Sequence, residues 1–183
     1  MKMKISKRRI GILIIFVIFI LLLESISIAT YQNAIQGEAE RNSVEERIEE
    51  SLEKNTTELT AEEQETLNLI NQYRKKMGLS ELKPFFELQE VSKLKAEDLV
   101  ENEYFSHTSP NLGTPFEMLQ QNGIDYIIAG ENLAGNVSPE KAVEAWINSP
   151  SHRDNILEGK FQYTGISVVE SPIYGKVFVQ LFI

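Results

Sequence analysis

The sequence has no cysteine, a single tryptophan and only two histidines among its 183 residues. Without cysteine it cannot form a disulfide, a thiol nucleophile or a thiolate metal site, so the core must be stable without the help of disulfides. Histidine is the side chain that ordinarily titrates near neutral pH, so the search for acid–base chemistry or metal binding starts at His107 and His152.

Positive charge is also scarce. Lysine and arginine total 18 against 27 aspartates and glutamates, which gives a formal net charge of −9. No basic patch stands out in the body of the chain, and this excludes a nucleic-acid partner. The length and the 42% share of hydrophobic residues predict one globular domain with appendages.

Residues 1–30 have the pattern of an export segment. Five lysines and arginines precede an apolar run, Ile10–Leu23, and this basic flank is expected to stay cytoplasmic. The run would form a helix of about 21 Å, shorter than a hydrocarbon core of ~30 Å, but extension to Ala29 gives a sufficient span. We therefore predict a signal anchor, which the span favours, or a signal peptide cleaved after Ser27-Ile28-Ala29.

Residues 31–63 are predicted to be an acidic linker. Ten glutamates face only three cations there, and Val44, Ile48 and Leu52 form a helical stripe too thin to bury a core. The interpretation is a solvated, partly helical spacer. A short coiled-coil seam is the alternative, but the segment has too few heptads for one.

Residues 64–183 are long enough for one self-sufficient core. Thr60 and Glu63 predict a capping box for a first helix that ends at Gly78. Further helices are expected over 87–102 and from Thr114-Pro115, and strands over 124–129 (running into 130–134), 163–169 and 176–182. Apolar spacing predicts that the first two helices turn these residues inward: Leu67, Ile70, Tyr73 and Met77, then Leu88, Val91, Leu94 and Leu99. This order predicts an α+β fold with helices on a small antiparallel sheet.

The stretch AVEAWINSPSHRDNIL, residues 142–157, contains the tryptophan and one histidine. Ser138 is a suitable N-cap for a helix that places Trp146 on its buried stripe, and Pro150 should end that helix. Ser151 is then expected to cap a second short helix with His152 in its first turn.

Glu131 stands in an apolar context, IIAGENLAG, where a solvated carboxylate is unexpected. A buried carboxylate needs a partner, and an imidazole is the obvious one. Both His107 and His152 lie beside turn-forming residues, so the three side chains could share one site. The alternative is that each side chain hydrogen-bonds its own loop.

Five motifs carry a family resemblance: FSHTSP, GTPFEMLQQNG, AGENLAG, AVEAWINSPSHRDNIL and YTGISVV. In order and spacing they resemble the CAP superfamily, or SCP domain, in its bacterial cell-envelope branch, over about residues 67–183. The resemblance implies an α-β-α sandwich with a small central antiparallel sheet flanked by helices. It also implies a surface cleft, which in many members carries two histidines and two glutamates and can hold a divalent metal such as zinc.

Carried over by position, the resemblance makes His107, Glu131 and His152 the metal ligands. Ser149 stands where animal and plant relatives have the second glutamate, and with Ser106 and Asn132 it is expected to line the cleft. Two imidazoles and one carboxylate can still form a zinc shell completed by a water.

Three classes of function remain open. The resemblance favours a non-enzymatic, extracytoplasmic module that binds a small ligand or the cell envelope. The alternative is a metal-dependent or serine-type hydrolase, such as a peptidase, which would use a metal-bound water activated by Glu131 or a nucleophilic Ser106 or Ser149. Neither serine lies in a G-x-S-x-G elbow. A lipid carrier is the third class, but no lipid-contacting segment has a match here.

We predict that residues 31–183 lie outside the cytoplasm, because a basic flank followed by an apolar span directs export. A reporter that is active only in the cytoplasm, fused after Ile183, should be inactive. Activity of that fusion would contradict the prediction, and a mature chain starting near Thr30 would indicate cleavage instead of anchoring.

Overall fold

The computed structural model describes residues 32, 35–39, 41–44 and 59–183. Residues 35–39 and 41–44 are helical. The predicted export segment lies outside these ranges, as does most of the predicted linker. Within these ranges no helix is long and apolar enough to cross a membrane.

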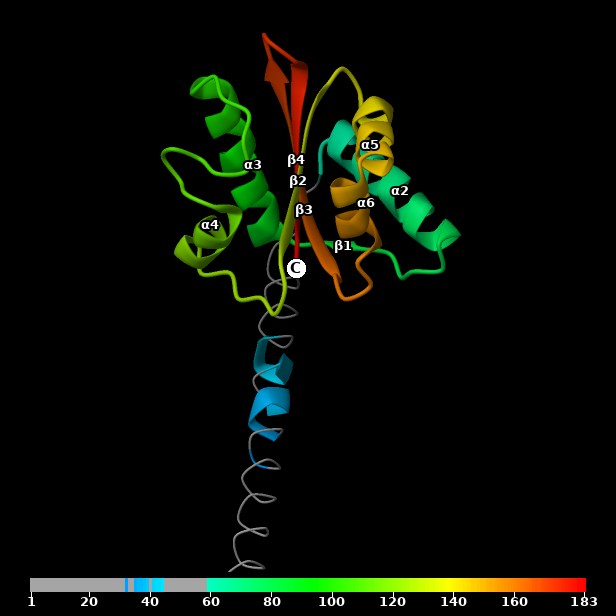
Figure 1. The fold of residues 1–183 in the computed structure, drawn as a ribbon, viewed down its shortest axis with the longest axis vertical. Helices are drawn as coiled ribbons and strands as arrows, with labels where there is room; N and C mark the ends of the chain where they lie inside the picture. Colours follow the sequence, from blue (N-terminus) through cyan, green and yellow to red (C-terminus); the bar gives the residue numbers. More distant parts are fainter. Residues whose placement is uncertain (1–31, 33–34, 40, 45–58) are drawn as a thin grey trace, which may run out of the picture. The chain divides into compact units, whose positions relative to one another are not determined.

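The domain is a four-stranded sheet between two layers of helices (Figure 1). Helices α3 and α4 cover one side of the sheet, and α2, α5 and α6 cover the other. The predicted α-β-α sandwich is therefore confirmed. In chain order the elements are α2 (Ala61–Lys76), β1 (Lys83–Pro84), α3 (Phe86–Glu101), α4 (Pro115–Gln121), β2 (Gly130–Asn136), α5 (Pro139–Asn148), α6 (Pro150–Leu157), β3 (Tyr163–Ser171) and β4 (Gly175–Phe182).

The strand order in the sheet is β1-β3-β4-β2. The pairs β3–β4 and β2–β4 are antiparallel, as predicted. The two-residue β1 runs parallel to β3, which the prediction of an antiparallel sheet did not include. The predicted strand over 124–129 was wrong. Pairing between β2 and β4 begins only at Gly130, opposite Phe182, so the apolar residues before it have no partner strand.

Three of the described helices begin where capping side chains predicted. Thr60 and Glu63 form the expected capping box at α2, Thr114 forms a second one at α4, and Ser138 caps α5. At α6 the prediction was wrong, because the cap is Ser149 and not Ser151. Proline is favoured at the first helical position, so Pro150 fixes the start of α6 directly after Ser149.

The inward faces of α2 and α3 each contain a buried cation that apolar spacing missed. In α2, Arg74 is fully buried whereas Met77 is 51% exposed. Arg74 donates hydrogen bonds to the backbone carbonyls of Ser80, Ile156, Glu158 and Phe161. In α3, Lys95 is fully buried and Leu94 is exposed. Residues 88, 91, 95 and 99 are three or four positions apart, so they lie on one face of α3. Leu94 was predicted to face inward in place of Lys95 only because leucine is apolar.

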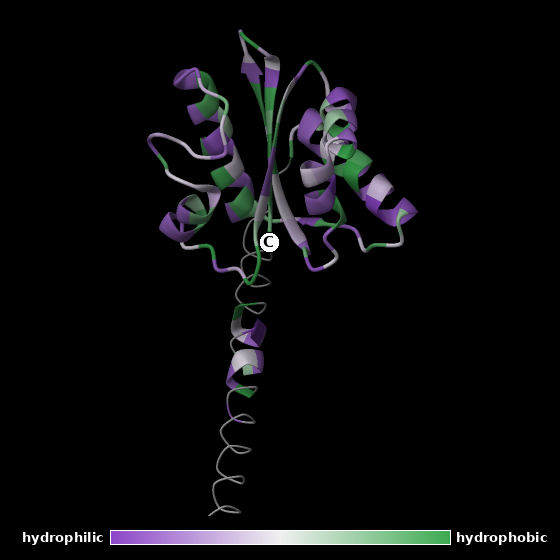
Figure 2. Ribbon diagram, viewed as in Figure 1, coloured by the Kyte–Doolittle hydropathy of each residue, from purple (hydrophilic) through white to green (hydrophobic). Residues whose placement is uncertain are grey.

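Trp146 occupies the core between α5 and the sheet, as its helix phase predicts. Its side chain is 1% exposed, and its Nε1 donates to the carbonyl of Leu133 at 2.9 Å. It belongs to an apolar cluster with Phe178 and Phe182 of β4. Figure 2 shows hydrophobic residues along the central strands, with hydrophilic residues prominent on the outer helix surfaces.

Trp146→Ala should lower the free energy of unfolding by about 3–5 kcal/mol, because it removes a large buried aromatic side chain and its hydrogen bond. Urea unfolding followed by circular dichroism measures this loss. Phe116→Ala is the matched control: Phe116 is 49% exposed, and its truncation should cost less than ~1 kcal/mol. Equal losses for the two variants would contradict the packing described here.

Candidate functional site

His107 lies on the loop between α3 and α4 and contacts Glu131 of β2. Its Nδ1 is 2.7 Å from Glu131 Oε1. The His107 side chain is 55% exposed, whereas that of Glu131 is only 2% exposed. The pair therefore extends from the molecular surface into the interior.

The next residue of β2 points to the opposite face of the sheet and contacts α6. Asn132 Nδ2 donates to the carbonyl of His152 at 3.1 Å, and Asn132 Oδ1 accepts from Asn155 Nδ2 at 3.0 Å. Asn155 Nδ2 also donates to the carbonyl of Glu131 at 3.1 Å. Two adjacent residues of β2 thus fix the His107 loop on one side and α6 on the other.

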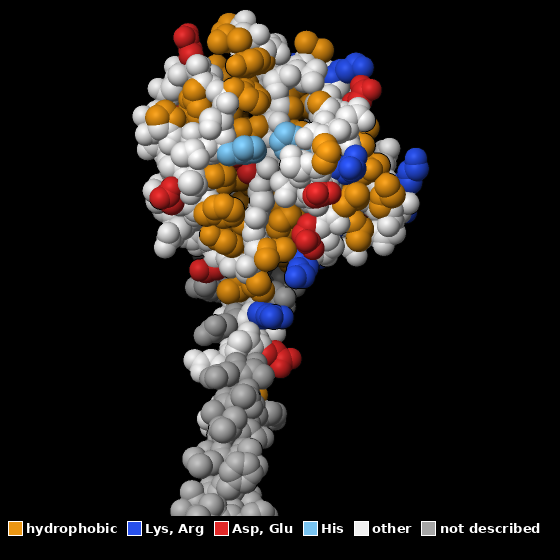
Figure 3. Space-filling model, viewed as in Figure 1, with side chains coloured by type: hydrophobic (Ala, Val, Ile, Leu, Met, Phe, Trp, Pro, Cys, Tyr) orange, Lys and Arg blue, Asp and Glu red, His pale blue; other side chains and the backbone are white. Residues whose placement is uncertain are grey.

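The two histidine rings meet beside this part of β2. Their centroids are 6.2 Å apart and their planes are inclined at 50°. Figure 3 shows both histidines on one face of the molecule, with hydrophobic side chains above and below them. The structure therefore brings together His107, Glu131 and His152, which are distant in sequence.

The two predicted serines lie near the histidines in sequence but are not bonded to them. Ser106 Oγ accepts from Thr108 N at 3.2 Å, and half-buried Ser149 has its Oγ 3.5 Å from that of Ser151. In the part of the chain that the structure describes, neither hydroxyl is hydrogen-bonded to a histidine. Their observed contacts are those of loop and turn residues.

Burial governs the charges at the site. It raises the pKa of Glu131, an effect opposed by the hydrogen bond from His107 and by the charge of Lys95. Burial, followed by the proximity of His107, lowers the pKa of His152. His152 is therefore neutral at physiological pH, which is the form that binds metals.

A polar network under the His107 loop was missed by the sequence analysis. Lys95 Nζ donates to Tyr104 Oη and to the carbonyl of Ser106, both at 2.9 Å. One turn along α3, Asp98 accepts hydrogen bonds from Tyr104, Asn102, Ser109 and Asn111. Burial lowers the pKa of Lys95, while Glu131 and Asp98 oppose that shift. The signal available in the sequence was the spacing of Lys95 on the buried face of α3.

The imidazoles of His107 and His152 are the groups at this site that could hold a metal ion. Within the described ranges, no three His, Cys, Asp or Glu side chains converge as a metal site. Glu131 Oε1 instead orients His107 through Nδ1, which leaves His107 Nε2 for a metal. Two imidazoles on one tetrahedral zinc have centroids about 5 Å apart, so half-exposed His107 would need to approach His152 by ~1 Å. Glu131 Oε2 is buried and has no hydrogen-bonding partner among the described residues.

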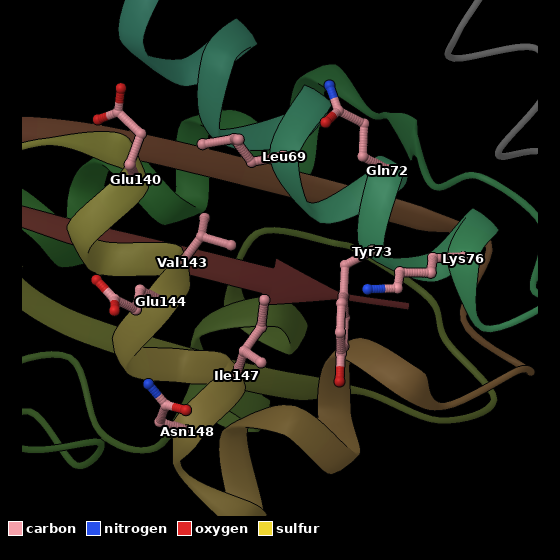
Figure 4. A pocket seen from close by; sticks show the side chains of 9 residues that line it. All are labelled: Leu69, Gln72, Tyr73, Lys76, Glu140, Val143, Glu144, Ile147 and Asn148. Carbon is pink, nitrogen blue, oxygen red and sulfur yellow. The ribbon is translucent and has the colours of Figure 1, made fainter.

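A separate groove lies between α2 and α5 and has a volume of about 570 Å³ (Figure 4). Its lining contains none of the predicted site residues. It consists of Leu69, Gln72, Tyr73, Lys76, Glu140, Val143, Glu144, Ile147 and Asn148. Glu144 of this lining pairs with Lys141 at 2.8 Å. The convergent titratable groups of His107, Glu131 and His152 make their surroundings the better candidate for a functional site than this groove.

Comparison with known proteins identifies the family. The profile of the cysteine-rich secretory protein (CAP) family matches residues 67–182, so the chain belongs to this family. The protein YkwD of Bacillus subtilis (strain 168) is 40% identical over 126 residues, which cover 68% of this chain and 48% of YkwD. Unlike the proteins for which the family is named, this chain contains no cysteine.

Two solved bacterial structures have the same fold. An extracellular protein containing an SCP domain from Bacillus anthracis str. Ames superposes with a TM-score of 0.62 at 30% identity, over 70% of this chain and 45% of that one. An outer surface protein of Borrelia burgdorferi gives 0.63 at 26% identity, over 70% of this chain and 96% of that one. This chain spans about half the length of YkwD and of the B. anthracis protein.

Glu131→Gln should stabilise the fold at pH 7. Folding raises the pKa of Glu131 above its ordinary value of 4.5. Its contribution to the free energy of unfolding is therefore favourable below pH 4.5 and is lost as pH rises through the raised pKa. Glutamine has no charge to bury, so its advantage should be largest at neutral pH and should vanish near pH 4. Urea unfolding at a series of pH values measures this.

The control is Glu144→Gln, since the exposed carboxylate of Glu144 has its pKa lowered by Lys141. This variant should gain no stability at pH 7. If Glu131→Gln were less stable than wild type at pH 7, the prediction would be wrong. The attraction between the Glu131 carboxylate and His107 would then outweigh the cost of burying that carboxylate.

Proposed function

We propose that this protein is an extracytoplasmic binding module whose cleft holds a divalent metal, such as zinc, and recognises a small or cell-envelope ligand. The observation that carries the proposal is the arrangement of His107, Glu131 and His152 at one edge of the sheet. A buried carboxylate without a full set of partners is costly to maintain, and a binding site gives it a role.

Metal binding is supported by the orientation of the His107 ring and by the neutral state of His152. His107 donates Nδ1–H to Glu131, a contact that orients the ring and leaves Nε2 as the nitrogen for a metal. His152 is held by the first turn of α6, and its lowered pKa keeps it neutral. A metal bound by the two imidazoles would supply open coordination positions for an oxygen ligand.

Binding is favoured over serine hydrolysis because neither candidate nucleophile contacts a base. Ser106 and Ser149 make only the local contacts described above. A metal-dependent hydrolase remains the alternative function, and cleavage assays on peptides and peptidoglycan with zinc present would detect it.

Localisation outside the cytoplasm has support from the relatives and from the N-terminus. The B. anthracis neighbour is an extracellular protein, and the Borrelia burgdorferi neighbour is an outer surface protein. The basic flank and apolar run of residues 1–30 provide the export signal. We propose that this segment anchors the domain to the membrane or is cleaved to release it.

Zinc titration calorimetry of the full chain in detergent micelles tests the metal site. Wild type should bind zinc at neutral pH, with binding fading below about pH 6 as His152 protonates, because a metal binds the neutral imidazole. His107→Ala and His152→Ala should each abolish binding, and Ser149→Glu should strengthen it by adding a carboxylate. Glu131→Gln should weaken it about tenfold, as expected for an orienting partner.

Glu144→Gln serves as the distant control and should bind zinc as wild type does. If the His107→Ala/His152→Ala double variant gave the wild-type isotherm, the metal site would be wrong. The three residues would then form a polar network that only shapes the cleft.

A further inference from the structure

Asp98 of α3 holds the part of the α3–α4 loop that follows His107. Its carboxylate accepts hydrogen bonds from Ser109 Oγ at 2.7 Å and from Asn111 Nδ2 at 3.1 Å. Ser109 also exchanges both backbone hydrogen bonds with Gly113, at 2.8 and 3.1 Å. The loop beyond the histidine is therefore closed on itself and fastened to α3.

Lys95, one turn earlier on α3, holds the part of the loop that precedes His107. Its Nζ donates to Tyr104 Oη and to the carbonyl of Ser106, both at 2.9 Å. The Ser106 carbonyl and the N–H of His107 belong to one planar peptide unit. A hydrogen bond to that carbonyl therefore fixes the direction in which the chain enters His107.

Lys95 also acts on the acceptor of the His107 hydrogen bond. Burial raises the pKa of Glu131, and the charge of Lys95 is one of the effects that oppose this rise. The contact between His107 Nδ1 and Glu131 Oε1 is thus influenced from both sides. Lys95 acts on the donor through the backbone of the loop and on the acceptor through its charge.

A cation at this position is costly to bury. Lys95 is fully buried, and burial lowers its pKa, although Glu131 and Asp98 oppose that shift. Among the described residues, no carboxylate forms a salt bridge with its ammonium group. An apolar side chain of similar size would avoid the cost of taking a charge out of water. The hydrogen bond to Ser106 is a contact that such a side chain could not make.

We propose that Lys95 is a positioning residue of the site, which sets the orientation of His107 through the Ser106 carbonyl and keeps Nδ1 on Glu131. With Nδ1 occupied in this way, Nε2 is the ring nitrogen left for a metal. Only this last step rests on the proposed function of the site, because the orientation of the ring does not require a metal.

Nuclear magnetic resonance of the full chain in detergent micelles, with isotope-labelled histidine, tests the orientation of the ring. The chain has only two histidines, so the signals of His107 can be assigned with His152→Ala. At about pH 8, above the ordinary titration range of imidazole, His107 of wild type should carry its proton on Nδ1. In Lys95→Gln the side chain is neutral and too short for both contacts, so His107 should become a mixture of the two tautomers.

Two matched controls separate Lys95 from its surroundings. Lys93→Gln makes the same change at an exposed lysine of α3 and should leave the tautomer as in wild type. Tyr104→Phe removes the other contact of Lys95 and one contact of Asp98, but it leaves the hydrogen bond to the Ser106 carbonyl. His107 should therefore keep its proton on Nδ1 in this variant as well.

Zinc calorimetry of the same variants gives a second readout. Lys95→Gln should bind zinc about tenfold more weakly than wild type, as expected when a metal-binding histidine loses its orientation. Lys93→Gln should bind zinc as wild type does. If wild type itself did not bind zinc, the proposed metal site would be wrong, and the tautomer of His107 would still decide the role of Lys95.

A mixture of tautomers already present in wild type, or an unchanged Nδ1–H tautomer in Lys95→Gln, would overturn the proposal. Equal loss of that tautomer in Tyr104→Phe would also overturn it, because the network as a whole would then hold the ring. Urea unfolding shows whether each variant is folded, and Lys95→Met repeats the test if Lys95→Gln is not. Loss of cooperative unfolding in both variants would make Lys95 a residue required for the fold and would likewise overturn the proposal.

Discussion

The hydrogen bond between His107 and Glu131 joins a surface loop to a buried strand, and the site is organised around it. Removing the Glu131 carboxylate from water disfavours its charge, and the compensation is limited to the His107 contact and the more distant cation of Lys95. In a low-dielectric interior such long-range attraction is stronger than in water, so a single buried lysine influences both Glu131 and Asp98. The loop that holds His107 is thus positioned by the same cation that favours ionised Glu131.

On the other side of β2, the helices that carry His152 are held by a different set of hydrogen bonds. Helices α5 and α6 are fastened to β2 by Trp146 and Asn155, which satisfy carbonyls that no strand satisfies. Arg74 then ties the C-terminal end of α6 to α2 through backbone carbonyls. Neutral and charged side-chain donors to carbonyls hold this layer together without any disulfide, so His152 is carried by a scaffold and not by a mobile loop.

The features predicted correctly from the sequence are those that depend on neighbouring residues. The predictions were wrong where contacts with residues distant in the sequence determine the structure. The caps of α2, α4 and α5, the helix phase of Trp146 and the two C-terminal strands follow from neighbouring residues, and the structure has them. The apolar segment 124–129 has strand propensity but no partner, and Arg74 and Lys95 are buried because distant carbonyls and a tyrosine satisfy them. His107, Glu131 and His152 were grouped mainly by family resemblance, because spacing along the chain does not show that a loop, a strand and a helix converge.

A free sheet edge is normally a risk, since exposed backbone groups can pair with other chains. Here the risk is reduced by coverage: Asn155 and Trp146 occupy the outward carbonyls of Glu131 and Leu133, and both of these residues are buried. An edge with few free acceptors pairs poorly with another strand, which must both donate and accept. The same strand whose edge is covered in this way positions Glu131 against His107 and Asn132 against the carbonyl of His152. The side chains that protect the edge therefore also hold the two walls of the site in place.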